Sequence, residues 1–354
     1  MKLGIGLYRH MLDNDHFDFA RQCGCTDLVV HLANYYDKDK IVMATNDKIN
    51  YGTSKAMDSI WELDNINSLV KETEKKGLNI YAIENFSPAD WYDILLDGPL
   101  KQQQMENLKR IITNVGKAGI KNFGYNFSLA GVWGHMKVKN GRGNAESTAF
   151  DATALDLDAR IPNGEIWNMT YGDNLDNGFI KDIDYVEIWQ RLEWFLQNIL
   201  PVAEEAGVLM ALHPDDPPMP MLRKTPRLVY QPDLYQKVLD LVPSKSNGIE
   251  FCMGSIQEMT EGNIYDTIEK YADKISYVHV RNVKGKVPNY TEVFVDEGDI
   301  DIRKALTLLH KHEFNGVLIP DHTPQMTCNA GWHAGMAYAL GYIKSELQHL
   351  GIND

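Results

Sequence analysis

Four residues that can bind a metal ion each follow a short apolar run in the second half of the sequence. The four segments read MALHPDDPP, IEFCMGS, YVHVRN and LIPDHTP. Each begins with the apolar and β-branched residues of a predicted strand and then presents one imidazole, thiol or carboxyl group. The candidate ligands are His213, Cys252, His279 and Asp321.

This donor set fits a divalent transition metal. Imidazole and thiolate bind zinc, iron(II) and similar ions, and a carboxylate also suits manganese. A metal ion deprotonates a coordinating thiol, so Cys252 would need no separate base. A five- or six-coordinate ion would keep positions for substrate oxygens, whereas a closed tetrahedral zinc site would be structural. Any one of these residues could be an ordinary hydrogen-bonded or buried side chain, but the four together favour a metal site.

Further polar residues near the predicted strand ends are candidates for substrate contacts and proton transfer. Arg281 lies two residues beyond His279, on the same side of an extended chain, and could bind a substrate carboxylate through two hydrogen bonds. Its alternative role is a salt bridge at the rim. His322 could act as acid or base, or orient Asp321 beside it. The other candidates for substrate contact are His31, Glu84 and Asn126.

These residues need a scaffold that brings many strand ends together. Short β-branched or aromatic runs alternate with longer helical segments along the chain, which predicts a closed (β/α)8 barrel. An open doubly wound sheet is the alternative, but the turn after the first run carries no GxGxxG motif. The predicted strands are Leu3–Tyr8, Asp27–Leu32, Asn79–Glu84, Asn122–Phe127, Leu209–Pro214, Gly248–Cys252, Ser276–Arg281 and Gly316–Asp321. The predicted helices are Asp15–Gly24, Ile60–Lys76, Leu100–Ala118, Tyr185–Ala206, Leu234–Val242, Ile264–Ala272, Ile302–Lys311 and Ala334–Leu350.

We expect one barrel domain over residues 1–354, with two long connections after the second and fourth strands. These connections are Ala33–Ser59 and Ser128–Lys181. Loops longer than about 12–15 residues are usually functional or disordered, and both follow the strand ends where barrel enzymes build their sites. The second connection contains Trp133, Phe150 and Trp167, so the insertion 128–181 is predicted to be an ordered lid or an oligomer contact.

The composition is that of an ordinary globular protein. The 354 residues are 44% hydrophobic and 24% charged, and the formal net charge is −14. Such a charge argues against nucleic acid or an anionic membrane as a partner. No apolar run approaches the length of a membrane span, and no export signal is evident. The four cysteines form no disulfide framework or CxxC zinc motif, so we expect a cytoplasmic protein that can form a homo-oligomer.

Several motifs together resemble those of the mannonate dehydratase family. The resemblance is strong from about residue 122 to the end, and HPDDPP is its most specific element. The motifs are GYNF (124–127), PVAEEAGVLMALHPDDPPMP (201–220), CMGS (252–255), HVRN (279–282), GDID (298–301) and PDH (320–322).

The resemblance implies a xylose-isomerase-like barrel that removes water from D-mannonate in hexuronate breakdown. The implied product is 2-dehydro-3-deoxy-D-gluconate, and the implied cofactor is Mn²⁺ or Fe²⁺. Carried over by motif, the metal ligands of the family fall on His213, Cys252, His279 and Asp321. These are the same four residues that the strand ends suggest.

The sequence departs from the family pattern at two places. The family has a motif resembling HHIPNGEVW after the second strand, whereas here IPNGEIW occupies 161–167 within the long insertion. The family also has a tyrosine after the eighth strand, where this chain reads AGWH and places Trp332. Indole cannot relay a proton as a phenol can. His333 and His322 are therefore the candidates for that proton transfer, and Trp332 is a candidate for substrate contact.

These observations predict a metal-dependent dehydratase that acts on D-mannonate or a related sugar acid. A base would remove the C2 proton, an acid would protonate the departing C3 hydroxyl, and Arg281 would hold the carboxylate. One alternative is a metal-dependent sugar isomerase or epimerase. Another is a barrel that binds sugar acids without catalysis.

Overall fold

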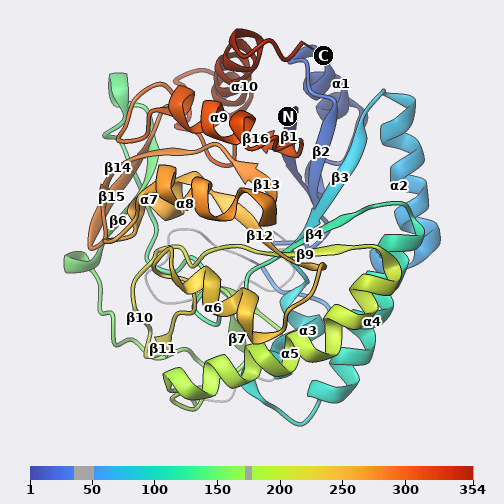
Figure 1. The fold of residues 1–354 in the computed structure, drawn as a ribbon. Coiled ribbons are helices and arrows are strands. Elements are labelled where there is room, and N and C mark those ends of the chain that lie inside the picture. Colours follow the sequence, from blue (N-terminus) through green and yellow to red (C-terminus); the bar gives the residue numbers. More distant parts are fainter. Residues whose placement is uncertain (36–51, 172–177, 354) are drawn as a thin grey trace.

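Eight parallel strands close into a barrel in a computed structural model that describes residues 1–35, 52–171 and 178–353 (Figure 1). The strand order around the barrel is β1-β16-β13-β12-β9-β4-β3-β2. This closed arrangement confirms the predicted (β/α)8 barrel. The barrel strands are β1 (Lys2–Tyr8), β2 (Asp27–His31), β3 (Asn79–Glu84), β4 (Asn122–Tyr125), β9 (Leu209–Leu212), β12 (Asn247–Cys252), β13 (Ile275–His279) and β16 (Val317–Ile319).

Helices surround the barrel and bury their apolar faces against it. The longest, α5, begins with a capping box in which Asp184 and Glu187 pair with each other's backbone N–H groups, and it ends before Gly207, whose φ is 67°. A left-handed residue of this kind favours glycine. The helices are α1 (Asn14–Gln22), α2 (Leu63–Lys75), α3 (Pro88–Leu96), α4 (Lys101–Lys117), α5 (Tyr185–Ala206), α6 (Leu234–Leu241), α7 (Met253–Glu258), α8 (Ile264–Tyr271), α9 (Ile302–Lys311) and α10 (Gly331–His349).

The structure corrects several predicted element boundaries. The strands β4, β9, β13 and β16 end two residues earlier than predicted. The residues beyond them, which carry much of the polar chemistry, therefore belong to loops. Two helices, α3 and α7, were not predicted. Both are short and directly follow a barrel strand or its loop, so neither shows a long apolar period that would separate it from a turn.

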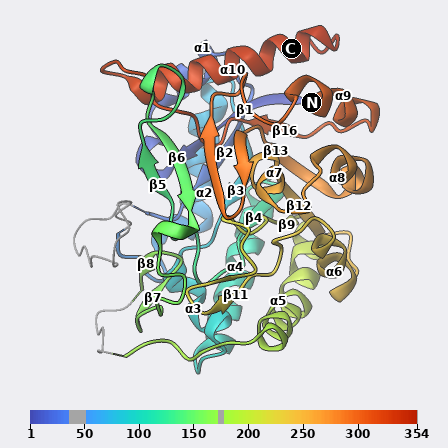
Figure 2. The same cartoon turned by 90° about the vertical axis from the view of Figure 1, so that its left-hand side faces the viewer.

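The described parts of the insertion after β4 include strands that lie beside the barrel (Figure 2). Its strands β5 (Met136–Val138) and β6 (Ser147–Asp151) join the unpredicted hairpin β14 (Asn282–Lys286) and β15 (Asn289–Val293) in a four-stranded antiparallel sheet. The sheet order is β14-β15-β6-β5. Two segments far apart in sequence thus form one wall beside the carboxyl ends of the barrel strands.

A second hairpin in the insertion consists of β7 (Glu165–Ile166) and β8 (Met169–Thr170). Its two turn residues, Trp167 and Asn168, have φ values of 51° and 60°. Positive φ at both central residues is the geometry of a tight hairpin turn, which asparagine tolerates and tryptophan rarely adopts. The turn fixes the position of the Trp167 ring.

The predicted connection Ala33–Ser59 lies partly outside the described residues. Within the described parts of the chain, none of the helices has the length and apolar character needed to span a membrane. The two short remaining strands are β10 (Met221–Leu222) and β11 (Thr225–Pro226), which pair with each other.

Candidate active site

A cleft with a volume of about 270 Å³ lies at the carboxyl ends of the barrel strands. The predicted residues His31, Glu84 and Asn126 contribute to its wall, together with residues from the insertion and from the segment after β16. The full lining comprises Tyr8, His31, Tyr35, Glu84, Asn85, Asn126, Val132, His135, Lys137, Thr148, Trp167, His213, Asp216, His279, Asp321, His322, Thr323, Gln325, Trp332 and Met336.

Three of the four predicted metal ligands converge at one point. One donor atom each of His213, Cys252 and His279 lies within 4.8 Å of the other two. Nδ1 of His213 is 2.6 Å from the carbonyl oxygen of Pro214, which can only accept, so this ring donates from Nδ1 and keeps Nε2 for a ligand. The carboxylate of Asp321 lies 3.6 Å from Nδ1 of His279, which places the fourth predicted ligand beside the other three.

The electrostatics of this group favour a bound cation. Burial alone would lower the pKa of an imidazole, yet Glu250 and Cys252 raise the pKa of His213 to about 9. Asp321 and Glu84 likewise outweigh burial and raise the pKa of His279. Burial favours a neutral Cys252 thiol, but Arg281 and His213 hold the pKa of that thiol well below its usual range. A thiolate and carboxylates therefore surround buried imidazoles.

Arg281 lies beneath the cleft rather than on its wall. Its side chain is 1% exposed, and its guanidinium group donates to Glu292 and Asp216, at 2.6 Å each. The same group donates to Ser255 at 2.8 Å and contacts the sulfur of Cys252 at 3.3 Å. Because protein acceptors occupy both terminal nitrogens of the buried guanidinium, this placement gives no support to the predicted substrate-carboxylate contact of Arg281. It instead positions a metal-ligand candidate.

His322 faces the cleft and is held by a buried carboxylate. Its Nδ1 lies 3.0 Å from Oε1 of Glu292, and its Nε2 lies 3.5 Å from Oδ1 of Asp321. Burial disfavours the charged ring, but Asp321 and Glu292 outweigh it and raise the pKa of His322. The ring is thus prepared to carry a proton at the edge of the cleft.

The pKa of His31 is displaced in the opposite direction to that of His322. Its Nδ1 lies 3.3 Å from the hydroxyl of Tyr35, its Nε2 lies 3.7 Å from Oε2 of Glu84, and Tyr8 stacks on the ring at 4.7 Å. Burial lowers the pKa of His31, although Glu84 works against that shift. Two histidines of the same cleft therefore have pKa values displaced in opposite directions.

The two aromatic residues after the predicted eighth strand have separate positions. Trp332 lines the cleft, and its contact with the substrate stays a prediction. His333 is not part of the lining: its ring packs against Phe19 at 4.9 Å and against His16 at 5.5 Å. The structure therefore does not bring His333 together with the other predicted site residues.

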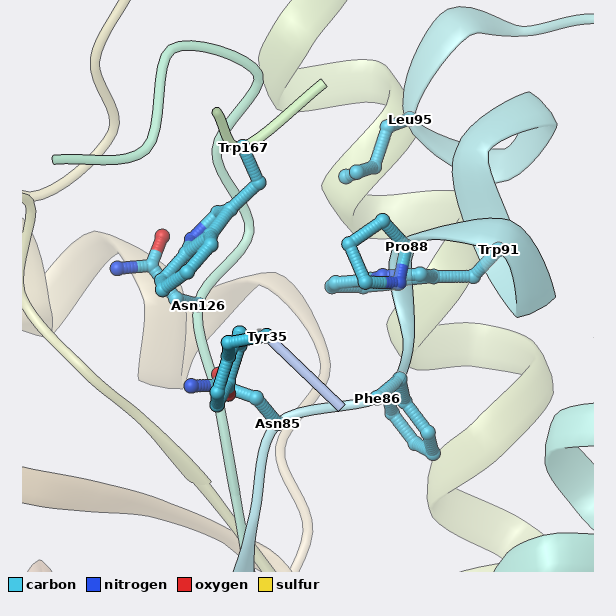
Figure 3. A pocket seen from close by; sticks show the side chains of 8 residues that line it. All are labelled: Tyr35, Asn85, Phe86, Pro88, Trp91, Leu95, Asn126 and Trp167. Atoms are coloured by element: carbon cyan, nitrogen blue, oxygen red, sulfur yellow. The ribbon is translucent and has the colours of Figure 1, made fainter. Parts of the chain in front are cut away.

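A narrow aromatic pocket adjoins the cleft (Figure 3). Tyr35, Asn85, Asn126 and Trp167 line both spaces. The rings of Tyr35 and Trp167 lie 5.4 Å apart and face the cluster of Phe86, Pro88, Trp91 and Leu95 (Figure 3). The pocket and the cleft therefore share part of their walls.

Several residues of the site were not found from the sequence. Glu250 lies two residues before Cys252 on β12, in the alternation that points both side chains into the barrel, and this spacing was an available signal. Glu292 lies in the unpredicted hairpin, and His135 in the insertion. His135 Nε2 lies 3.1 Å from Oδ1 of Asp216 and 2.8 Å from the hydroxyl of Tyr290. No local pattern relates these residues, because tertiary pairing brings them together.

Comparisons of the sequence with a family model and with known proteins point to the same family. The sequence matches a family model described as D-mannonate dehydratase (UxuA) over residues 41–353. A mannonate dehydratase of Streptococcus pneumoniae (strain 70585) is 32% identical over 275 residues, which cover 74% of this chain and 74% of that protein. A mannonate dehydratase of Oceanobacillus iheyensis is 28% identical over 337 residues, covering 83% and 88% of the two chains.

Solved structures agree with this assignment. The crystal structure of mannonate dehydratase from Streptococcus suis serotype 2 is similar with a TM-score of 0.74 and 28% identity, covering 100% of this chain and 95% of that one. The structure of an L-ribulose 3-epimerase is similar with a TM-score of 0.58 and 14% identity, covering 98% and 95% of the two chains. The second likeness shows a shared fold.

Proposed function

Because this chain belongs to the D-mannonate dehydratase family and is a sugar-acid hydro-lyase, we propose that D-mannonate is its substrate and 2-dehydro-3-deoxy-D-gluconate its product. The observation that carries the proposal is the convergence of His213, Cys252 and His279 beside Asp321 in the cleft. The family match extends over the segments that supply all four residues.

The family implies a divalent metal, and the residues of this site fit one. Neither ring nitrogen of the buried His279 has a hydrogen-bond partner among the described residues, and such an orphaned ring is suited to a ligand role. We propose that His213, Cys252, His279 and Asp321 hold Mn²⁺ or Fe²⁺. When bound, the ion would act as a Lewis acid toward substrate oxygens.

The opposite pKa displacements of two histidines support an assignment of acid and base. We assign the acid to His322, because Glu292 holds its Nδ1 and the raised pKa favours a protonated ring that can protonate the departing C3 hydroxyl. We assign the base to His31, because burial keeps that ring neutral. Nε2 of His31 faces the Glu84 carboxylate, so the accepting nitrogen is Nδ1, which lies 3.3 Å from the hydroxyl of Tyr35.

The insertion supports the proposed reaction by covering one side of the cleft. It supplies His135, Lys137, Thr148 and Trp167 to the wall, which fits the role of a lid that excludes water. An oligomer contact for the same insertion and a cytoplasmic location for the enzyme stay predictions from the sequence.

The proposal is tested by incubating the protein with D-mannonate and Mn²⁺ or Fe²⁺ and measuring the new α-keto acid. We expect keto-acid formation that a chelator abolishes. The Cys252→Ala variant should lose both metal and activity, because a ligand is removed at a site that is otherwise intact. An isomer of the substrate formed without loss of water would contradict the proposal and favour an isomerase or epimerase.

A further inference from the structure

We propose that Lys137 binds the carboxylate of the sugar-acid substrate, an assignment that rests on the proposed dehydratase function. The substrate is an anion, and the described lining of the cleft contains the acidic side chains of Glu84, Asp216 and Asp321. Lys137 is the only lysine or arginine among the described residues of that lining. Within the described lining, Lys137 is therefore the ammonium group that such a carboxylate can meet.

The alternative cation cannot reach the substrate without giving up its present partners. Arg281 is buried and forms ion pairs or hydrogen bonds with Glu292, Asp216 and Ser255. Withdrawing it from those buried carboxylates would leave charges unpaired in the interior, which is strongly unfavourable. Among the lysine and arginine side chains of the described residues, recognition of the substrate carboxylate therefore falls to another element.

The position of Lys137 is set by the antiparallel sheet of the insertion. Lys137 on β5 lies directly opposite Thr148 on β6, and its Nζ donates to Oγ1 of Thr148 at 2.8 Å. Directly opposed residues share a face of the sheet, and here both line the cleft. An ammonium group has three donors, so two remain for a ligand after this bond.

A second contact fixes this sheet against the loop that carries the reacting groups. The backbone N–H of Gln325 donates to the carbonyl oxygen of Glu146, one residue before β6, at 2.9 Å. The same loop holds Asp321 and His322. Lys137 also lies within electrostatic reach of Glu292: burial raises the pKa of that carboxyl, but His322, Arg281 and Lys137 together lower it to about 2. Lys137 therefore lies near the carboxylate that holds the proposed acid, His322.

This arrangement predicts selectivity for acids over neutral sugars. Lysine acts as a point charge whose interaction with an anion weakens as salt is added, because the side chain remains exposed to solvent. A charge-assisted hydrogen bond of this kind corresponds to roughly a tenfold to hundredfold change in affinity.

The test compares equilibrium binding of D-mannonate and of the neutral hexitol D-mannitol to the metal-loaded protein. Lys137→Met should weaken D-mannonate binding about tenfold to hundredfold and reduce its salt dependence, while D-mannitol binding and metal content stay unchanged. Lys137→Arg should restore part of the affinity. Lys139→Met is the matched control: it removes the same charge two residues away, at a position outside the cleft lining, and should leave both ligands unaffected.

The possible failures separate the two proposals. Unchanged D-mannonate affinity in Lys137→Met, or equal losses for both ligands, would overturn the carboxylate assignment even if the wild-type protein forms keto acid. If the wild-type protein instead binds D-mannonate through Lys137 but releases no keto acid, the dehydration is wrong and the carboxylate assignment holds. A wild-type protein that binds no D-mannonate would overturn both.

Discussion

Glu84 and Glu250 approach the same atom, Nε2 of His279, at 3.4 Å and 3.2 Å. Two buried carboxylates in one place resist simultaneous ionisation. Burial and the charge of Glu84 raise the pKa of Glu250 to about 8, whereas His31 and His279 outweigh burial and lower the pKa of Glu84 to about 2. The pair therefore carries one negative charge near pH 7, located on Glu84. Nε2 of His279 faces that charge without forming a hydrogen bond, and Nδ1 lies on the side of Asp321, where we propose the metal binds.

This relationship predicts unequal effects of two isosteric substitutions on metal affinity. Glu84→Gln removes the charge that orients and polarises His279, so metal affinity should fall about tenfold to hundredfold. Glu250→Gln replaces a group that is already neutral and should have a much smaller effect. Competition with a chelator of known affinity measures both. A larger loss in Glu250→Gln would show that the charge resides on the other carboxylate.

The buried position of Arg281 predicts a loss that does not depend on the charge of the ligand. Arg281→Lys cannot reproduce the simultaneous contacts with Glu292, Asp216, Ser255 and Cys252, because an ammonium group lacks the planar fork. We expect about 3–5 kcal/mol lower stability, since buried carboxylates lose their partner, together with reduced metal content.

Thermal unfolding and elemental analysis measure these two effects. Binding of D-mannonate and D-mannitol should weaken to the same extent in Arg281→Lys, in contrast to Lys137→Met. A selective loss of the acid would instead restore the substrate-carboxylate role that the sequence suggested for Arg281.

The barrel and the convergence of the candidate ligands could be predicted because both depend on local sequence. Each strand is a short apolar run, and successive strands of a parallel barrel present their carboxyl ends at one rim. Residues at the ends of such runs, such as His213 and Cys252, therefore lie close together regardless of how the loops fold. Three of the four predicted ligands converge in the structure, with the fourth beside them.

The remaining parts of the site depend on relationships that the linear sequence does not display. Arg281 follows the same alternation as His279, but β13 ends at His279, so the expected extended geometry does not continue to Arg281. His333 is adjacent to Trp332, yet consecutive residues of a helix point in different directions, and only Trp332 reaches the cleft. Lys137 enters the site through a sheet whose other hairpin lies about 150 residues later in the chain.

Asp90 in α3 predicts a pH-dependent stability away from the cleft. Burial raises the pKa of Asp90 to about 6, even though the backbone N–H of Met57 donates to its Oδ1 at 2.7 Å. Between pH values of about 4 and 6 the unfolded chain loses this proton while the folded chain keeps it, so the contribution of Asp90 to stability is lost as the pH rises. Asp90→Asn removes this dependence and should be more stable than the wild type at pH 7 by about 2 kcal/mol.

Chemical denaturation of both proteins at pH 4 and at pH 7 tests the Asp90 prediction. The difference between variant and wild type should be small at pH 4 and should grow as the pH rises. A constant difference over this range would mean that the carboxyl group titrates at its ordinary pKa in the folded protein.

Two histidines near the end of the chain should respond differently to the same substitution. His322→Ala removes the proposed acid, which Glu292 holds at the cleft, so turnover of D-mannonate should fall about 10²–10⁴-fold. Metal content should remain normal, because none of the four proposed ligands is changed. His333→Ala is the matched control: its ring packs against Phe19 outside the cleft lining, so turnover should stay close to that of the wild type. Single-turnover formation of the keto acid, measured with metal content on the same samples, distinguishes the cases. An active His322→Ala variant combined with an inactive, metal-loaded His333→Ala variant would reverse the assignment of the acid.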